Sequence, residues 1–129
     1  MEQDILKEDV TRNNKPSETI VLCGASSYEQ KYFFNEQFRM LPEEVKKELQ
    51  VLCVLFTEDV GGVLTLEFES DGTLEFKVQV DDGDYLFDEI GSELKIRRYQ
   101  KEKRELLESL ELYYRVVFMG EQVEGLDEA

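Results

Sequence analysis

The most acidic short segment of the chain is VDDGDYLFDE at residues 80–89, and its carboxylates could bind a cation. A helix-loop-helix calcium loop needs oxygen ligands at alternating positions, a glycine at the sixth position and a glutamate at the twelfth. Counted from Asp81, the sixth residue is Leu86 and the twelfth is Ser92. The pattern fails at both positions, so we expect no dedicated metal site in this segment.

Paired carboxylates are the next groups that could carry a reaction. The adjacent acids Glu58–Asp59 and Asp88–Glu89 could form an acid–base pair, but glycoside hydrolysis needs two carboxylates across a cleft, one of them with a raised pKa. In a chain with thirty acidic residues, adjacent acids are expected from composition alone. Histidine, the usual general base at neutral pH and the commonest transition-metal ligand, does not occur. We therefore expect no catalytic residue and no cofactor.

The two cysteines could act as nucleophiles only with a nearby base and partial exposure. Cys23 and Cys53 lie instead in the apolar runs TIVLCGA and VLCVLF. This context predicts buried, unbonded thiols in a reducing compartment. A strand followed by Gly24 and a helix start is similar to a phosphate-binding turn, but one glycine without a lysine is a poor match.

Charge limits the classes of partner. Thirty Asp and Glu residues against fifteen Lys and Arg give a net charge of −15. Such a chain repels phosphate backbones and anionic lipid head groups, so nucleic-acid binding and membrane binding are disfavoured. An acidic surface can steer a basic protein partner. No apolar run could span a bilayer, and the N-terminus MEQDILKEDV is unlike a signal peptide, so we expect a cytoplasmic protein.

The elements that would position these groups form one domain. A length of 129 residues is typical of a single core. Residues 1–17 are polar and predict a mobile tail, residues 18–120 predict the domain, and residues 121–129 predict an acidic tail. The expected fold class is α+β, with an antiparallel β-hairpin or small sheet packed against two or three helices, including a long C-terminal helix.

The first half of the domain is predicted to hold one strand and two helices. The run ETIVLC at residues 18–23 is rich in apolar and β-branched residues and predicts a strand. Ser26 and Glu29 have the spacing of a capping box and predict a short helix. A further helix starts at Pro42, and apolar residues follow at helical spacing until Gly61.

The clearest pattern in the chain is a β-hairpin in VLTLEFESDGTLEFKVQV, where apolar and polar residues alternate twice. A two-residue turn would place apolar residues opposite polar ones, which a sheet with one buried face does not tolerate. A three-residue loop at 70–72 instead pairs Phe68 with Leu74 and keeps apolar residues opposite each other along both strands. Gly72 then takes the left-handed conformation of the bulged turn.

The acidic segment is predicted to be a turn followed by a helix start. Asp84 would cap a helix that begins at Tyr85. Asp81 and Asp82 would face water. The apolar residues of the segment would anchor it to the core, and these are Tyr85, Leu86, Phe87 and Ile90.

The last helix is predicted to run from about residue 92 to residue 118. Apolar residues recur in steps of three and four along it, with Lys103 as the one polar residue in the stripe. A wide apolar stripe favours packing on the hairpin. Dimerisation through the exposed remainder of the helix is the alternative.

Aromatic residues are concentrated in YEQKYFFNEQF at residues 28–38. Core packing accounts for two or three of them, and any exposed remainder would form a binding patch. Together with Arg39 and Met40, they are the residue types of interface anchors. The predicted interaction surface combines three of these aromatics with acids of the hairpin and of the turn: Tyr32, Phe34, Phe38, Glu67, Glu69, Glu75, Asp81 and Asp82.

Four segments of the chain resemble a known family. They are VLCGASSYEQKYFFNEQF, LPEEVKKELQVLCVLFTEDVGGVLTLEF, DEIGSELKI and ELYYRVVFMGE. Together they resemble a family of small uncharacterised proteins of clostridial bacteria that is catalogued as a domain of unknown function. The resemblance covers roughly residues 21–121, and LFTEDVGGVLTLEF is its most distinctive part. It implies a small cytosolic domain and brings no activity, cofactor or catalytic residue.

Three hypotheses for the function follow. The first is a non-enzymatic protein-interaction module with a basic or mixed partner, acting as a monomer or homodimer. The second is an immunity-type inhibitor or DNA mimic, whose acidity blocks a basic toxin or a DNA-binding protein. The third is an unrecognised enzyme that uses carboxylates. Small acidic immunity and adaptor proteins have a similar outline, but fold does not fix function.

Overall fold

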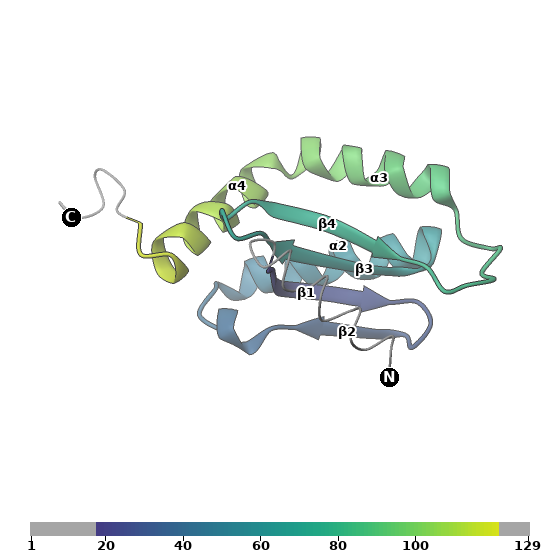
Figure 1. Ribbon diagram of the computed structural model, residues 1–129, viewed down its shortest axis with the longest axis horizontal. Coiled ribbons are helices and arrows are strands. Elements are labelled where there is room, and N and C mark those ends of the chain that lie inside the picture. The colour runs from purple at the N-terminus through teal and green to yellow at the C-terminus, as the bar shows by residue number, and fades with distance from the viewer. Residues whose placement is uncertain (1–17, 122–129) are drawn as a thin grey trace, which may run out of the picture.

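The computed structural model describes residues 18–121, so the predicted N-terminal tail and all but Glu121 of the predicted C-terminal tail lie outside the described residues. The fold class is α+β, as predicted, with a four-stranded antiparallel sheet in the order β2-β1-β3-β4. The helices lie on one face of this sheet (Figure 1). The elements are β1 (Ile20–Ser26), β2 (Lys31–Phe34), η2 (Glu36–Phe38), α2 (Glu43–Val60), β3 (Val63–Phe68), β4 (Leu74–Gln79), α3 (Glu89–Glu102), α4 (Arg104–Tyr113) and η3 (Tyr114–Phe118).

The predicted hairpin is confirmed in both its strands and its register. Phe68 pairs with Leu74, and the apolar pairing continues as predicted through Leu66 with Phe76 and Leu64 with Val78. The loop closes through a hydrogen bond in which the Gly72 N–H donates to the Glu69 carbonyl oxygen over 2.8 Å. Gly72 has φ of 92°, so its left-handed conformation is also confirmed.

The first predicted strand exists but starts and ends later than expected, as β1. It pairs with β3 on one side and with β2 on the other. The pairing with β3 shifts by one residue between Val21 and Cys23, which is a β-bulge. Because the bulge adds a residue to β1, both Leu22 and Cys23 are buried against the helices instead of alternating between faces.

The helix predicted at Ser26 is wrong, because residues 27–30 form a turn and residues 31–34 form strand β2. The expected side-chain contact is present, since Ser26 Oγ accepts a hydrogen bond from the Glu29 N–H over 3.1 Å. This contact closes a turn between two strands here, which a serine side chain can do as well as cap a helix. β2 then alternates, with Tyr32 and Phe34 directed to the helical layer and Phe33 left exposed.

The second predicted helix is confirmed as α2, with Pro42 at its N-terminal cap position and two acidic residues in its first turn. Leu49, Leu52 and Phe56 bury its inner face. Val51 and Leu55 are about half exposed, at 50% and 49%, so apolar side chains also lie on the outer side of α2. The helix covers β1 and β3 and supplies the centre of the core.

The long helix predicted for residues 92–118 is divided at Lys103 into α3 and α4, and the last turn widens into the π-helical η3. Lys103 leaves the helical conformation, and its Nζ lies 2.8 Å from Glu48 Oε2 on α2. Lys95 Nζ similarly lies 2.6 Å from Asp59 Oδ2. The polar residue in the predicted stripe is therefore the point where the helix breaks and joins α2.

Aromatic side chains close the end of the core where η2, β3 and η3 meet. The ring centroids of Phe68 and Tyr114 lie 4.3 Å apart, and those of Phe38 and Phe118 lie 4.7 Å apart. Phe38 and Phe68 are fully buried. This stack fixes the C-terminal part of the chain to the sheet.

Candidate interaction site

The acidic segment at residues 80–88 projects from one end of the domain, between β4 and α3 (Figure 1). The helix predicted to begin at Tyr85 is absent, because residues 81–88 form successive turns and α3 starts at Glu89. Asp88, not Asp84, caps the helix: its Oδ1 accepts a hydrogen bond from the Gly91 N–H over 2.9 Å. The cap was predicted one turn too early.

The prediction that the apolar residues of this segment anchor it to the core is wrong for three of the four. Tyr85 and Leu86 are each 94% exposed, and Ile90 is 74% exposed. Only Phe87 packs against the core, where its ring approaches Gly61 and Gly62. Phe87 thus attaches the segment to the core, while the side chains of Tyr85, Leu86 and Ile90 are exposed to solvent.

The turn is fixed by hydrogen bonds on the side opposite Phe87. The Tyr28 hydroxyl donates to Asp84 Oδ2 over 2.6 Å and accepts from the Asp81 N–H over 3.0 Å. Asp84 Oδ1 in turn accepts from the Leu86 N–H over 3.0 Å. The hydrogen bond to the Asp84 carboxylate raises the pKa of Tyr28 above its ordinary value. Tyr85 and Leu86 are therefore exposed on a backbone whose conformation is well determined.

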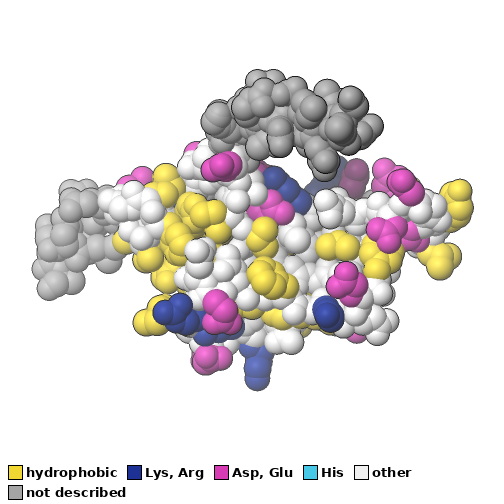
Figure 2. Space-filling model, turned by 60° about the horizontal axis from the view of Figure 1, so that its bottom comes forward, with side chains coloured by type: hydrophobic (Ala, Val, Ile, Leu, Met, Phe, Trp, Pro, Cys, Tyr) yellow, Lys and Arg dark blue, Asp and Glu magenta, His cyan; other side chains and the backbone are white. Residues whose placement is uncertain are grey.

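We call this surface the acidic tip. It consists of three exposed apolar residues, Tyr85, Leu86 and Ile90, surrounded by five acids: Asp81, Asp82, Asp84, Asp88 and Glu89. The end of the molecule where this segment lies shows hydrophobic side chains beside acidic ones (Figure 2). Aromatic and aliphatic anchors within a charged rim are the anatomy of a protein interface. Within residues 18–121, no group of three or more potential ligands could hold a metal ion.

The cap of α3 gives a direct test of this geometry. Replacing Asp88 with Ala should lower the free energy of unfolding by about 1 kcal/mol, because the first turn of α3 loses its side-chain acceptor. Thermal or urea unfolding measures the change. Replacing the exposed Asp82 with Ala is the control and should change stability by less than about 0.5 kcal/mol. An equal effect of the two substitutions would contradict the assignment of the cap.

The acids predicted on the hairpin lie on the sheet face opposite the helices. Two of them, Glu67 and Glu69, form salt bridges within the sheet. Lys77 Nζ lies 3.6 Å from Glu67 Oε1 and 3.1 Å from Glu69 Oε2. Glu67 also accepts hydrogen bonds from the hydroxyls of Thr19 and Thr65, both over 2.7 Å. Burial alone would raise the pKa of Glu67, but these hydroxyls and the Lys77 ammonium hold that pKa below its ordinary value. Glu75 alone is exposed and has no salt bridge to a described residue.

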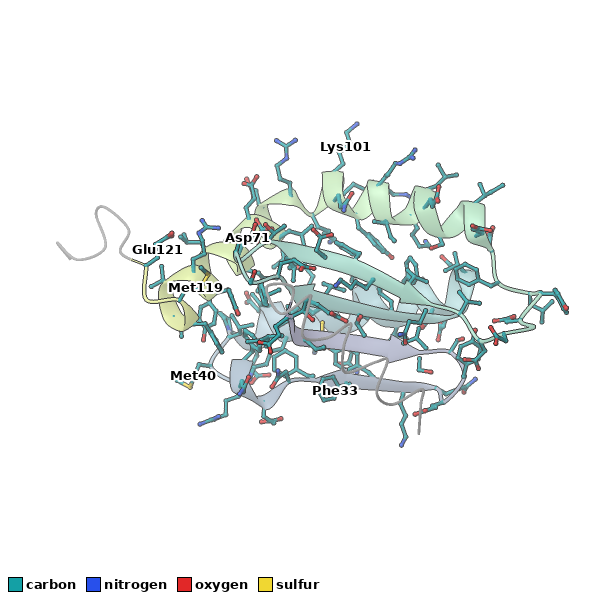
Figure 3. The ribbon with its side chains drawn as sticks, in the orientation of Figure 1. Phe33, Met40, Asp71, Lys101, Met119 and Glu121 are labelled. Carbon is teal, nitrogen blue, oxygen red and sulfur yellow. The ribbon has the colours of Figure 1, made fainter. Side chains whose placement is uncertain are left out.

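The predicted aromatic anchors, Tyr32, Phe34 and Phe38, lie neither in the acidic tip nor beside the acids of the hairpin. Phe38 is fully buried, so its assignment to a binding surface is wrong. Tyr32 and Phe34 are half buried beside α2, and Tyr32 lines an open hollow of about 610 Å³ between the β1–β2 turn and α2. Phe33, which was not predicted, is 55% exposed, and it projects from the β2 edge in Figure 3. The predicted surface therefore divides into three separate places, of which only the turn combines acids with exposed apolar anchors.

The two thiols are buried and unbonded, as predicted, and they lie side by side between β1 and α2. Cys23 Sγ and Cys53 Sγ are 3.8 Å apart. The contact with Cys23, together with burial, raises the pKa of Cys53 above its ordinary value. The Tyr32 hydroxyl is buried near them without a hydrogen-bond partner among the described residues, and burial raises its pKa as well.

These thiols should react slowly in the native protein, because both side chains are fully buried and the site must open before a reagent can reach them. We expect labelling by a maleimide or disulfide reagent to be roughly a hundredfold slower in the native than in the denatured protein, as for an opening that costs about 3 kcal/mol. Stopped-flow or mass-spectrometric labelling at constant pH measures both rates. Fast native labelling of either cysteine would reopen the nucleophile hypothesis.

Residues 19–122 match the model of a family of unknown function, DUF6145. The chain belongs to this family. The family membership predicted from the four segments is thus confirmed, and the match includes the whole acidic tip. Membership of DUF6145 assigns no activity to the domain. No curated protein and no solved structure matches the chain. None of the helices within the described part of this DUF6145 member is long and apolar enough to cross a membrane.

Proposed function

We propose that the domain is a non-enzymatic protein-interaction module that binds a basic surface of a partner protein through the acidic tip. The observation that carries this proposal is the 94% exposure of Tyr85 and Leu86 on a turn fixed by Tyr28 on one side and Phe87 on the other. Neighbouring exposed apolar side chains that are rimmed by polar residues mark interaction sites more often than single exposed ones do.

The energetics favour binding at this place. Covering each of these apolar side chains contributes about 1.5–3 kcal/mol, the usual gain for a fully buried residue of this size. Because the turn is already ordered by hydrogen bonds, little conformational entropy is lost on binding. The surrounding carboxylates attract a basic partner and raise the association rate. Apolar anchors would thus supply affinity, and the acids would select the partner.

The test compares tip variants with a control in which two less exposed apolar side chains are removed elsewhere. The double variant Tyr85→Ser with Leu86→Ser removes the anchors, whereas Phe33→Ser with Val117→Ser removes two apolar side chains that are 55% and 56% exposed elsewhere. In affinity capture from native lysate followed by mass spectrometry, we expect a protein with a basic surface to be retained by the parent and by the control. Its recovery should fall roughly tenfold or more with the tip variant, as for the loss of interface anchors.

Two further variants distinguish the contribution of the apolar side chains to affinity from the contribution of the acids to the association rate. Asp81→Asn with Asp82→Asn should slow association and reduce its dependence on salt, with little effect on stability. Tyr28→Phe should weaken binding by loosening the turn, since the hydroxyl touches Asp81 and Asp84 and is not itself in the apolar centre. Capture that is unchanged by the loss of Tyr85 and Leu86 would refute the proposed function.

The two other hypotheses have less support. A DNA mimic needs an array of carboxylates that are free to imitate phosphates, whereas Glu67 and Glu69 are neutralised by Lys77 within the sheet. An enzyme that uses carboxylates needs a pair of them across a cleft. The hollow between the β1–β2 turn and α2 has only one carboxylate in its lining, that of Glu58. A second open hollow beside Tyr32 is lined by Glu36 and Glu43, but both are exposed and Glu43 pairs with Lys46.

A further inference from the structure

The basic residues of this acidic chain are unevenly distributed. Six of its fifteen Lys and Arg residues fall within ten consecutive positions that run from the middle of α3 to the start of α4: Lys95, Arg97, Arg98, Lys101, Lys103 and Arg104. Lys95 and Lys103 have a structural role, because they pair with Asp59 and Glu48 of α2. The other four are exposed and make no salt bridge to another described residue. A concentrated basic surface therefore remains that the fold does not use.

The exposed side of α3 continues directly from the acidic tip. Ile90, Leu94, Arg97 and Lys101 follow one another in steps of four and three, the spacing of residues that contact a second helix. Ile90 and Leu94 are 74% and 56% exposed. Lys101 projects away from the sheet (Figure 3), and no described element lies on the outer side of α3 (Figure 1). This row is apolar at its start and basic at its end.

The charges along α3 are self-complementary. Its first half carries Glu89 and Glu93 beside the apolar residues, and its second half carries Arg97, Arg98 and Lys101, which make no salt bridge to another described residue. We infer that the basic surface bound by the acidic tip is the second half of α3 in another copy of this chain, in an antiparallel, two-fold symmetric dimer. This inference rests on the proposed function, because it names the partner of the same site.

Two-fold symmetry makes this arrangement close on itself. In an isologous contact each copy presents the same patch, so the acidic start of one α3 meets the basic end of the other twice. The distance from Ile90 to Lys101 is about 16 Å at 1.5 Å per residue, so both contacts fit along a single helix pair. Ile90 and Leu94 of one copy then pack on the aliphatic stems of Arg97 and Lys101 of the other.

Charge reversal tests the pairing. The variant Arg97→Glu with Lys101→Glu makes both halves of the row acidic, and Glu89→Lys with Glu93→Lys makes both halves basic. Sedimentation velocity over a concentration series should show a dimer for the parent that weakens with salt. Each double variant should raise the dissociation constant of the dimer by roughly tenfold or more, as for loss of close charge pairs across an interface. Lys31→Glu with Lys47→Glu, on β2 and α2, is the control of equal charge change and should leave the dimer intact.

The decisive result is the mixture of the two reversed variants. An equimolar mixture should form a heterodimer with the affinity of the parent, since the acidic row of one variant then meets the basic row of the other at both contacts. Circular dichroism confirms that each variant is folded. Arg97→Gln with Lys101→Gln repeats the test with neutral side chains if charge reversal disturbs folding.

The outcomes distinguish this inference from the proposed function. A parent that stays monomeric at all concentrations and ionic strengths, or a dimer that survives both charge reversals, overturns the inference. If a different basic protein is then lost with Tyr85→Ser and Leu86→Ser, the proposed function still holds. If the dimer forms as described and the same tip variant dissociates it, both are supported.

Discussion

Replacing Phe38 with Ala should lower the free energy of unfolding by about 3–5 kcal/mol, the largest effect expected of any single substitution considered for this domain. Phe38 is fully buried, and its ring stacks on Phe68 and Phe118 with centroid distances of 5.5 and 4.7 Å. The substitution leaves a cavity at the junction of η2, β3 and η3, which rigid neighbouring strands cannot collapse to fill. Urea unfolding measures the change from the midpoint at constant slope.

Phe33→Ala is the matched control for this experiment. The side chain is of the same type, lies five residues earlier and is 55% exposed. Its removal should cost about 1 kcal/mol or less. Equal unfolding midpoints for the two variants would show that Phe38 is not part of the core and would restore its predicted place on a binding surface.

The second large effect is expected at the hairpin loop, where Gly72→Val should cost about 2–3 kcal/mol. Gly72 has φ of 92°, which a β-branched residue adopts only at a considerable energetic cost. A Cβ atom there would also lie 2.8 Å from Arg115 Cγ and 3.3 Å from Met119 Sδ, so these two side chains must move to admit it. The hairpin loop and the end of η3 lie side by side in Figure 3.

Gly83→Val separates the two contributions. Gly83 has φ of 82°, but a Cβ atom there would have no neighbour within 4 Å. This variant therefore carries the backbone penalty alone, about 1–2 kcal/mol. The difference between the two variants reports the contact with η3. A Gly72→Val protein that melts like its parent would contradict the three-residue loop.

The hairpin could be predicted in full because its two strands each have one buried face. Alternation of period two then leaves a single register in which Phe68, Leu66 and Leu64 all face apolar partners. Gly72 follows from that register and from the loop length. Here the sequence pattern and the tertiary environment impose the same constraint.

Strand β2 could not be predicted because its local signal is ambiguous. The hydrogen bond from the Glu29 N–H to Ser26 Oγ closes a strand-to-strand turn as well as it would start a helix. The strand is favoured over the helix because β1 offers an edge to pair with, and Phe33 pairs there with Gly24. That edge is created by the pairing of β1 with β3, which is distant in the sequence.

The candidate site was located in the right segment but with the wrong apolar residues. Asp81 and Asp82 were placed correctly as exposed acids, whereas Tyr85 and Leu86 were assigned to the core. Only Phe87 finds space there, because Gly61 and Gly62 leave room for its ring. This room depends on the end of α2, so the local sequence does not reveal it. The cations of α3 were overlooked because net charge averages over the whole chain.

The position of β1 in the sheet determines how this domain must fold. β1 with β2, and β3 with β4, are hairpins that close over short loops, whereas Ile20 and Phe68 pair although the whole of α2 lies between them in the sequence. Closing the long segment between β1 and β3 lowers the entropy of the chain, and this cost comes before the contacts between the two strands can stabilise the fold. Gly24 lies in this junction, where any Cβ would come within 2.7 Å of the Leu64 carbonyl oxygen. We therefore expect association of the two hairpins across Gly24 to set the folding rate, because the contacts within each hairpin are local in the sequence.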